Sequence, residues 1–281
     1  MKSKKLTILI SILLVVTLVV VLASTVFTLK SVSFNFLNQK NILSNYDDGD
    51  YLDKIEVPYG DSIFFVDKNS LKDKLEKKNA YLEVINIETT FPNNLVVHVG
   101  EREEVFAIDY GNDTYAIVDK SLKILRFCDL AYLQRAGYLA PIVVKVNYTD
   151  VALDIKDYNI CDFINVEHMS DVLLAVVNAF EVSGYNITSL KGFATEIILR
   201  ENGSFIVDEN GQYDLNFVKT VEITTKYGIK ISINDAYSSL DTKVALGLKA
   251  YEMEHDKHNT SGEILVFEQE KRFVARYRSG D

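Results

Sequence analysis

The residues best placed for metal chemistry lie in the run Glu254-His255-Asp256-Lys257-His258, at the end of an expected helix. Its two histidines are three positions apart, a spacing that brings both onto one face of a helix. The zinc protease pattern, however, needs histidines four positions apart around a glutamate, and Lys257 adds an opposing positive charge. We therefore prefer the alternative that these side chains stabilise a solvated helix C-terminus.

Other residues that could carry chemistry have simpler structural interpretations. His98 alternates with Val97 and Val99, which predicts a strand residue on the polar face of a sheet. The acidic run from Tyr46 to Asp53 could bind calcium, but it lacks the EF-hand ligand spacing, and we favour a solvated loop. The sequence contains no phosphate-binding glycine loop and no nucleophile elbow. We therefore expect no enzyme activity, no cofactor and no metal.

Composition and charge narrow the class of protein and its partners. Of the 281 residues, 48% are hydrophobic and 25% are charged, which is typical of a folded chain with a core. This length suits one large domain or two small ones. The formal net charge of −10 disfavours nucleic acid and anionic lipid surfaces as partners.

Cys128 and Cys161 are the only cysteines of the chain. An exported location would permit a disulfide between them. Two separate buried thiols are the alternative that we prefer, and the sequence leaves both open. No cysteine spacing indicates a zinc site.

The segment from Leu6 to Leu29 is uncharged and rich in Leu, Ile and Val, which predicts a transmembrane helix over residues 6–29. Three lysines precede this segment, whereas only Lys30 follows it closely. Because Lys and Arg are enriched on the cytoplasmic side, residues 1–5 are expected to form a cytoplasmic tail, with the rest of the chain outside. A cleaved signal peptide is the alternative, since Ala23 and Ser24 offer small residues, but the apolar run is longer than that of a usual signal sequence.

Residues 30–102 show the pattern of a small α+β domain. Alternating apolar residues predict a strand around Val32 to Phe36, and Ser70 has capping-box spacing to Asp73 at the start of a short helix. Two further strands, over 82–90 and 95–99, flank the turn residues Phe91 to Asn94.

Residues 103–281 have the pattern of a second α+β domain, which is dominated by short antiparallel strands. The pair Asn202-Gly203 predicts a hairpin turn, since such pairs favour tight turns. Apolar stripes predict helices over 171–182 and 240–254, packed on one face of the strands. Two strands, over 263–268 and 272–278, end the domain.

The stretch from Ala80 to Arg102 resembles the end of the POTRA domain in the FtsQ/DivIB family of cell-division proteins. In that family an aromatic-Pro-Asn-x-Leu turn leads into an alternating strand that ends in Glu-Arg. The matching residues here are Phe91, Pro92, Asn93, Leu95, Glu101 and Arg102. Tyr115 to Asp119 and Gly60 to Asp67 are also similar to family segments, whereas Leu37 to Lys40 depart from the family pattern.

This resemblance implies a noncatalytic scaffold with a membrane anchor, a POTRA-like domain at 30–102 and a β domain at 103–281. It implies binding to other membrane division proteins, among them small bitopic coiled-coil proteins and proteins of septal peptidoglycan synthesis. The expected location is the cell membrane at the division septum. The segment implied to pair with a partner strand contains Phe273, Val274, Ala275, Arg276, Tyr277 and Arg278.

Other functions remain open at the level of sequence. Phe273 suits the core as well as an interface, while Tyr277, near the terminus, favours an interface. A membrane-tethered POTRA chaperone or sensor unrelated to division is one alternative. An envelope enzyme with a carboxylate site is another, and paired carboxylates with shifted pKa values in a cleft would distinguish it.

Overall fold

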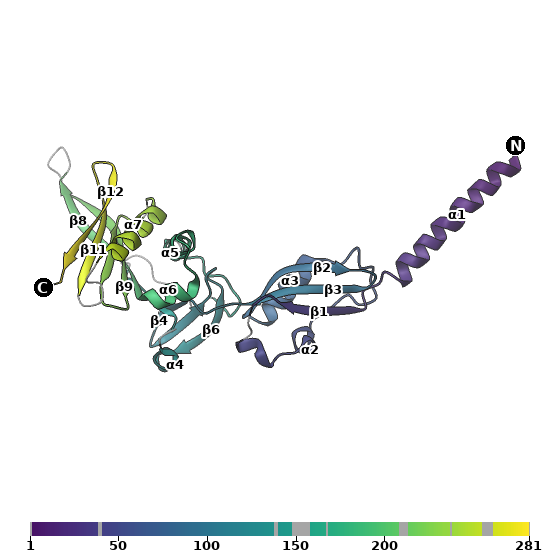
Figure 1. Ribbon diagram of the computed structural model, residues 1–281, viewed down its shortest axis with the longest axis horizontal. Coiled ribbons are helices and arrows are strands. Elements are labelled where there is room, and N and C mark those ends of the chain that lie inside the picture. Colours follow the sequence, from purple (N-terminus) through teal and green to yellow (C-terminus); the bar gives the residue numbers. More distant parts are fainter. Residues whose placement is uncertain are drawn as a thin grey trace. The chain divides into compact units, whose positions relative to one another are not determined.

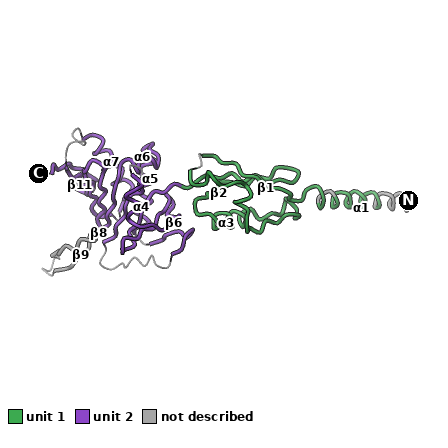
Figure 2. The backbone as a smooth tube through the Cα atoms, turned by 90° about the horizontal axis from the view of Figure 1, so that it is seen from below, with its two compact units in different colours: residues 1–102 green, residues 103–281 purple. Residues whose placement is uncertain are grey.

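The computed structural model describes residues 2–38, 41–137, 140–147, 158–166, 168–207, 213–236, 238–254 and 261–280. The chain divides into two compact units, Met1–Arg102 and Glu103–Asp281 (Figure 2). Both units combine helices with sheets, which confirms the expected α+β class.

The first unit contains one long helix, three strands and shorter helices. In chain order these are α1 (Lys2–Thr25), β1 (Ser31–Phe36), η1 (Ile42–Asn45), α2 (Asp48–Leu52), α3 (Lys68–Lys78), β2 (Leu82–Thr90) and β3 (Asn94–Glu101) (Figure 1). The large apolar side chains described between Ile10 and Val21 of α1 are all at least half exposed. Among the described residues, no helix has the length and apolar character needed to cross a membrane.

The three strands form a sheet in the order β1-β3-β2, in which β1 runs parallel to β3 and β2 antiparallel to it. The predicted strand around Val32 to Phe36 and the hairpin around Phe91 are confirmed. Leu71 and Leu75 of α3 are buried in the same core as Leu95 and other strand residues. His98 lies on the polar face as expected, with Nδ1 3.2 Å from Asn35 Nδ2 and Nε2 3.3 Å from Glu88 Oε2.

Two local predictions in this unit were wrong. Asp67, rather than Ser70, caps α3, since the Asp67 side chain accepts a hydrogen bond from the Ser70 backbone N–H. The acidic run from Tyr46 to Asp53 is not a loop, because Asp47 and Asp50 form a capping box at the start of α2. In both places a carboxylate satisfies N–H groups that the first turn of a helix leaves open.

The second unit is built on one large sheet in the order β12-β11-β10-β9-β8-β7-β4-β5-β6. Its strands are β4 (Phe106–Gly111), β5 (Thr114–Val118), β6 (Ile124–Asp129), β7 (Ile142–Asn147), β8 (Ala194–Val207), β9 (Tyr213–Thr225), β10 (Lys230–Asn234), β11 (Gly262–Gln269) and β12 (Arg272–Ser279). Its helices are α4 (Leu130–Ala136), α5 (Met169–Val182), α6 (Ile187–Phe193) and α7 (Leu240–Met253).

The sheet is mixed, with a majority of antiparallel pairs. The neighbours β4–β7, β7–β8 and β10–β11 are parallel, while the other pairs are antiparallel. Parallel neighbours need a crossover connection. Helices form two of these connections, since α5 and α6 lie between β7 and β8 in sequence and α7 lies between β10 and β11, while β5, β6 and α4 lie between β4 and β7.

The two predicted helices, α5 and α7, pack on the same face of this sheet as expected, and α4, which was not predicted, packs on the other face. The main core joins one face of the strands to α5 and α7, including Val172 and Leu248. Ala107 and Ile117 point to the opposite face, where they form a smaller cluster with Leu133 of α4. Successive strand residues point to opposite faces, so short apolar runs in β4 and β5 support helices on both sides.

The predicted hairpin at Asn202-Gly203 was also wrong. Both residues lie inside the continuous strand β8, where Asn202 pairs with Val218 and Gly203 with Phe217 of β9. Tertiary pairing overrides the local turn preference, because a long neighbouring strand satisfies the backbone across this position. The predicted helices over 171–182 and 240–254 and the last two strands are confirmed.

Candidate functional site

The predicted partner-binding segment coincides with β12, which is the terminal strand of the large sheet. β12 pairs with β11 on one side, and in the described part of the chain no strand follows on its other side. An edge strand carries unpaired N–H and C=O groups along its open side, and a strand from another chain can satisfy them.

The pairing with β11 determines which backbone groups point to this open side. Gly280 N–H donates to Ser261 O, and the unbroken register runs from Gly262↔Ser279 to Gln269↔Arg272. In an antiparallel pair, residues that bond to the neighbour alternate with residues whose N–H and C=O point away. Even-numbered residues of β12 therefore bond to β11. The backbone groups of Phe273, Ala275 and Tyr277 face the open edge.

The side chains of these three residues lie on the face of the sheet that α7 covers. Ala275 packs partly against the main core, and Lys243 Nζ of α7 lies 5.2 Å from the centre of the Phe273 ring. A Cβ atom at Gly262 would come within 2.5 Å of the Tyr277 ring, so glycine permits this ring to pack on the backbone of β11. Tyr277 nevertheless remains 36% exposed.

The opposite face of β12 is strongly basic. Arg276 Nη2 donates to Gln269 Oε1 at 2.7 Å, and its guanidinium carbon lies 5.3 Å from the Phe267 ring centre. Arg272 and Arg278 are exposed at alternate positions on the same face, around the half-buried Val274. The edge therefore combines outward-facing backbone groups, a positive face and a partly aromatic face.

Lys243 of α7 packs against β12 on the helix-covered face of the sheet, and its side chain has no exposed surface. Its Nζ donates to Asp235 O at 2.6 Å and to Ser238 Oγ at 3.2 Å, and lies 3.6 Å from Asp235 Oδ2. The buried ammonium holds the connection between β10 and α7 while it contacts Phe273 of β12. Lys243 lies inside α7, at a helix position where an exposed lysine would be ordinary.

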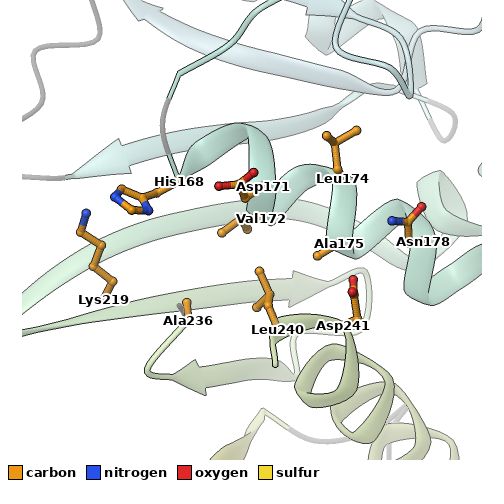
Figure 3. A pocket seen from close by; sticks show the side chains of 10 residues that line it. All are labelled: His168, Asp171, Val172, Leu174, Ala175, Asn178, Lys219, Ala236, Leu240 and Asp241. Atoms are coloured by element: carbon orange, nitrogen blue, oxygen red, sulfur yellow. The ribbon is translucent and has the colours of Figure 1, made fainter. Parts of the chain in front are cut away.

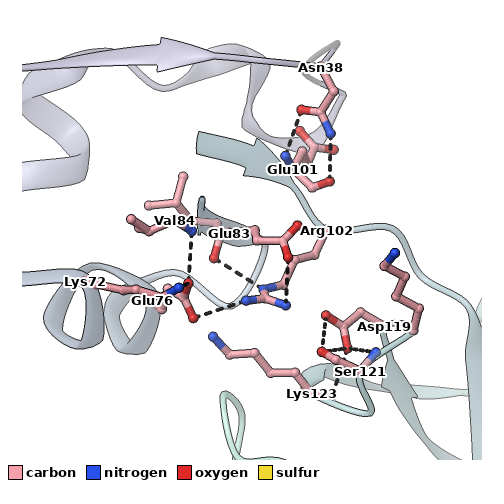
Figure 4. Close-up of polar contacts among 12 residues, drawn as sticks. Asn38, Lys72, Glu76, Glu83, Val84, Glu101, Arg102, Asp119, Ser121 and Lys123 are labelled. Carbon is pink, nitrogen blue, oxygen red and sulfur yellow. Dashed lines mark hydrogen bonds and ion pairs between the residues drawn. The ribbon is translucent and has the colours of Figure 1, made fainter. Parts of the chain in front are cut away.

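The motif residue Glu101 binds the segment that follows β1 in the first unit. Its carboxylate accepts three backbone N–H groups, from Asn41 at 2.8 Å, Ile42 at 2.9 Å and Leu43 at 2.9 Å. Its backbone bonds in both directions to the Asn38 amide (Figure 4). Glu101 thereby fixes the chain after β1, in the region where the sequence departs from the family pattern.

The neighbouring Arg102 is a second buried motif residue. Its Nη2 lies 3.1 Å from Glu76 Oε2, and its Nη1 lies 3.9 Å from Glu83 Oε1. Glu76 Oε1 also accepts the backbone N–H of Val84 at 2.9 Å, so the pair joins α3 to β2 (Figure 4). These contacts assign the Glu-Arg motif to folding of this unit rather than to an exposed binding surface.

The other motif residues divide between core and surface. Leu95 is completely buried, whereas Phe91 is 59% exposed and Pro92 follows it through a cis peptide bond. Asn93 O accepts the backbone N–H of Lys30 at 2.8 Å, which links the turn to the start of β1. Only Phe91 and Pro92 are therefore open to a partner.

Similar turn chemistry explains Asp119 in the second unit. Its Oδ1 accepts the backbone N–H of Ser121 at 2.9 Å and of Lys123 at 2.8 Å (Figure 4). Asp119 is only 3% exposed. It fixes the turn between β5 and β6.

A pocket of about 300 Å³ lies where α5 and α7 begin in the second unit. Figure 3 shows His168 and Lys219 toward one end and Asn178 and Asp241 toward the other. Val172, Ala175 and Leu240 are among the apolar residues of its wall. Carboxylates and a lysine line the same space, so the pocket has no single charge preference.

Metal and thiol chemistry have little support in the described residues. No group of three or more His, Cys, Asp or Glu side chains that could hold a metal ion occurs among them. His255 and His258 lie outside the described residues. Cys128 and Cys161 are both thiols, so no disulfide joins them, and burial raises the pKa of the Cys128 thiol.

Comparison with protein families matches residues 43–102 to the model described as POTRA domain, FtsQ-type. A search of curated proteins gave no match to the chain. The matched residues include most of η1, all of α2 and α3, the β2–β3 hairpin and the Glu101-Arg102 pair. The chain thus carries a POTRA-like domain of the FtsQ type at residues 43–102.

Proposed function

We propose that this chain is a noncatalytic scaffold of the bacterial cell-division machinery, which binds other division proteins outside the membrane. The observation that carries this proposal is the FtsQ-type POTRA domain at residues 43–102. POTRA domains bind proteins rather than transform substrates.

The proposal includes a single membrane-spanning segment. Its support is the sequence from Leu6 to Leu29, which is free of charge, with three lysines before it. The N-terminus would then lie in the cytoplasm and residues 31–281 outside the membrane.

The proposed mechanism of partner binding is strand addition at β12. Support comes from the outward N–H and C=O groups of Phe273 and Ala275. Arg272, Arg276 and Arg278 favour a partner strand with acidic residues on its matching face, since opposite charges across an interface guide association. The partners would be small bitopic coiled-coil proteins and proteins of septal peptidoglycan synthesis.

Localisation tests the scaffold proposal directly. A functional fluorescent fusion to the cytoplasmic N-terminus should form a band at midcell before constriction begins in growing cells of the source organism. Uniform labelling of the envelope throughout the cell cycle would contradict a division role. In that case the POTRA chaperone or sensor would be the better interpretation.

Two proline variants test strand addition, because neighbouring residues of β12 point their N–H groups in opposite directions. Ala275→Pro removes an N–H from the open edge, whereas the matched control Arg276→Pro removes one that bonds to β11. With a photo-crosslinker at position 277, Ala275→Pro should abolish crosslinks to division proteins and keep the fold. Arg276→Pro should in addition lower the stability of the second unit, because it removes a hydrogen bond to β11. Wild-type crosslinking by a folded Ala275→Pro variant would disprove strand addition.

A further inference from the structure

Three phenylalanines, Phe27, Phe64 and Phe91, form an aromatic cluster in the first unit. The Phe27 ring centre lies 5.5 Å from that of Phe64 and 6.1 Å from that of Phe91. The Phe64 and Phe91 centres are 5.5 Å apart. These distances, with two tilted pairs and one T-shaped pair, are those of attractive aromatic contacts, so the three rings pack together in this unit.

The cluster is nevertheless largely open to solvent. Phe64 is 55% exposed and Phe91 59% exposed, and the adjacent Phe65 is 87% exposed. Aromatic side chains of this size contribute large apolar areas. Grouped exposure of apolar surface marks an interaction site more often than single exposed residues do.

Backbone bonds hold this cluster close to the end of α1. Ile63 N–H donates to Phe27 O at 2.8 Å, and Leu29 N–H donates to Asp61 O at 2.8 Å. Phe27 follows Thr25, the last residue of α1, by only two positions. Two residues span at most about 7 Å of extended chain, so the helix end and the cluster cannot separate widely.

If α1 spans a bilayer, the short connection between Thr25 and Phe27 places the aromatic cluster at the membrane surface. In the sequence, the uncharged run that begins at Leu6 reaches Thr25 after about 20 residues, which is the length that a hydrocarbon core requires. Phe27 then falls in the interfacial layer, which is about 5–8 Å thick on each side. Aromatic rings favour this layer, and apolar rings at its boundary remain shielded from water.

We propose that the aromatic cluster docks onto the lipid surface and holds the POTRA-like domain against the membrane. This inference rests on the proposed membrane anchor. Asp61 and Asp67 flank the Phe64-Phe65 pair in sequence, so the contact depends on apolar insertion rather than on attraction to anionic lipids. Zwitterionic phosphatidylcholine is therefore the appropriate surface, and docking persists at high salt.

The chain lacks tryptophan, so a single introduced indole reports on one position only. The full chain, reconstituted into phosphatidylcholine vesicles, should be compared as Phe64→Trp, Phe91→Trp and two control variants. Val15→Trp reports on α1. Tyr227→Trp replaces a 51% exposed aromatic residue of the second unit. Acrylamide in the water and brominated phosphatidylcholine in the bilayer serve as quenchers.

Docking predicts that brominated lipid quenches both cluster variants and the Val15→Trp variant. Emission from both cluster variants should shift to shorter wavelength than that of the Tyr227→Trp control, which acrylamide alone should quench. If lipid quenches only the Val15→Trp variant, the anchor stands and docking is wrong. If lipid quenches none of the variants, both proposals fail. The cluster variants could instead be shielded from acrylamide only while the protein is concentrated in the vesicles. If adding more lipid, which dilutes the protein in the bilayer, removes this shielding, a second copy of the chain covers the cluster. That result would also overturn docking.

Discussion

Arg102 Nη2 lies 3.1 Å from Glu76 Oε2, and both side chains are almost buried. Removing one partner of a buried ion pair leaves the other charge uncompensated, which costs about 3–5 kcal/mol. We expect Arg102→Met to lower the free energy of unfolding of the POTRA-like domain by about 3 kcal/mol. Urea unfolding, with hydrogen exchange of the β2 and β3 amides, measures this loss.

Lys72→Met provides the matched control for this pair. Lys72 is 44% exposed and lies 3.9 Å from the other oxygen of Glu76. Its loss should change stability by no more than about 0.5 kcal/mol, because exposed ion pairs contribute little. Equal effects of the two substitutions would contradict the role assigned to Arg102.

Glu101→Gln tests the hydrogen bonds of Glu101 to the segment after β1. The carboxylate accepts N–H groups of Asn41, Ile42 and Leu43, but an amide offers only one oxygen and places an N–H₂ donor against donors. We expect a loss of about 2 kcal/mol, with faster hydrogen exchange at these three amides. Glu103→Gln, at an exposed neighbouring position, should leave the exchange rates unchanged.

The raised pKa of Tyr51 predicts that the protein loses stability at alkaline pH. Burial, with a further contribution from the Asp48 carboxylate, raises the pKa of Tyr51 to about 12 from an ordinary value near 10. The unfolded chain therefore loses this proton first, and stability falls between about pH 10 and pH 12 by on the order of 2 kcal/mol. Below pH 10 the contribution is fully present.

Unfolding of the wild-type chain and of Tyr51→Phe at pH 9 and pH 11.5 measures this effect. The variant loses the hydrogen bond from Tyr51 Oη to Leu43 O, which costs about 1 kcal/mol at both pH values. Its further alkaline loss should be smaller than that of the wild type. Identical pH dependence of the two chains would rule out Tyr51 as the source.

Lys243→Met should destabilise the second unit near its open edge. The substitution leaves the Asp235 carbonyl and the Ser238 hydroxyl without their buried donor, which costs about 3 kcal/mol. Hydrogen exchange should accelerate in β12 as well as in the connection between β10 and α7, because Lys243 contacts Phe273. Lys249→Met, exposed on the same helix, is the control. If exchange in β12 is unchanged, Lys243 supports only the connection.

Local patterns in the sequence determined much of the fold. Alternation predicts β1 and the β2–β3 hairpin, and apolar stripes predict α5 and α7, because these periodicities follow directly from strand and helix geometry. The aromatic-Pro-Asn-x-Leu turn with its closing Glu-Arg pair indicated the POTRA-like domain. In the structure, Leu95, Glu101 and Arg102 of this motif are buried and hold the fold of the domain together. Partner binding by β12 stays a prediction.

Only the tertiary structure decided how distant segments pair. Asn202-Gly203 lies within a strand because β9 runs alongside it, a contact between residues far apart in the chain that no local preference encodes. The roles of Glu76 and Lys243 likewise depend on partners brought together by folding. The same holds for the open edge: the order of strands placed β12 at the end of the sheet, and its register with β11 decided which backbone groups face outward. Register and strand order are set by packing of the whole sheet, which a period of two residues along one strand cannot specify.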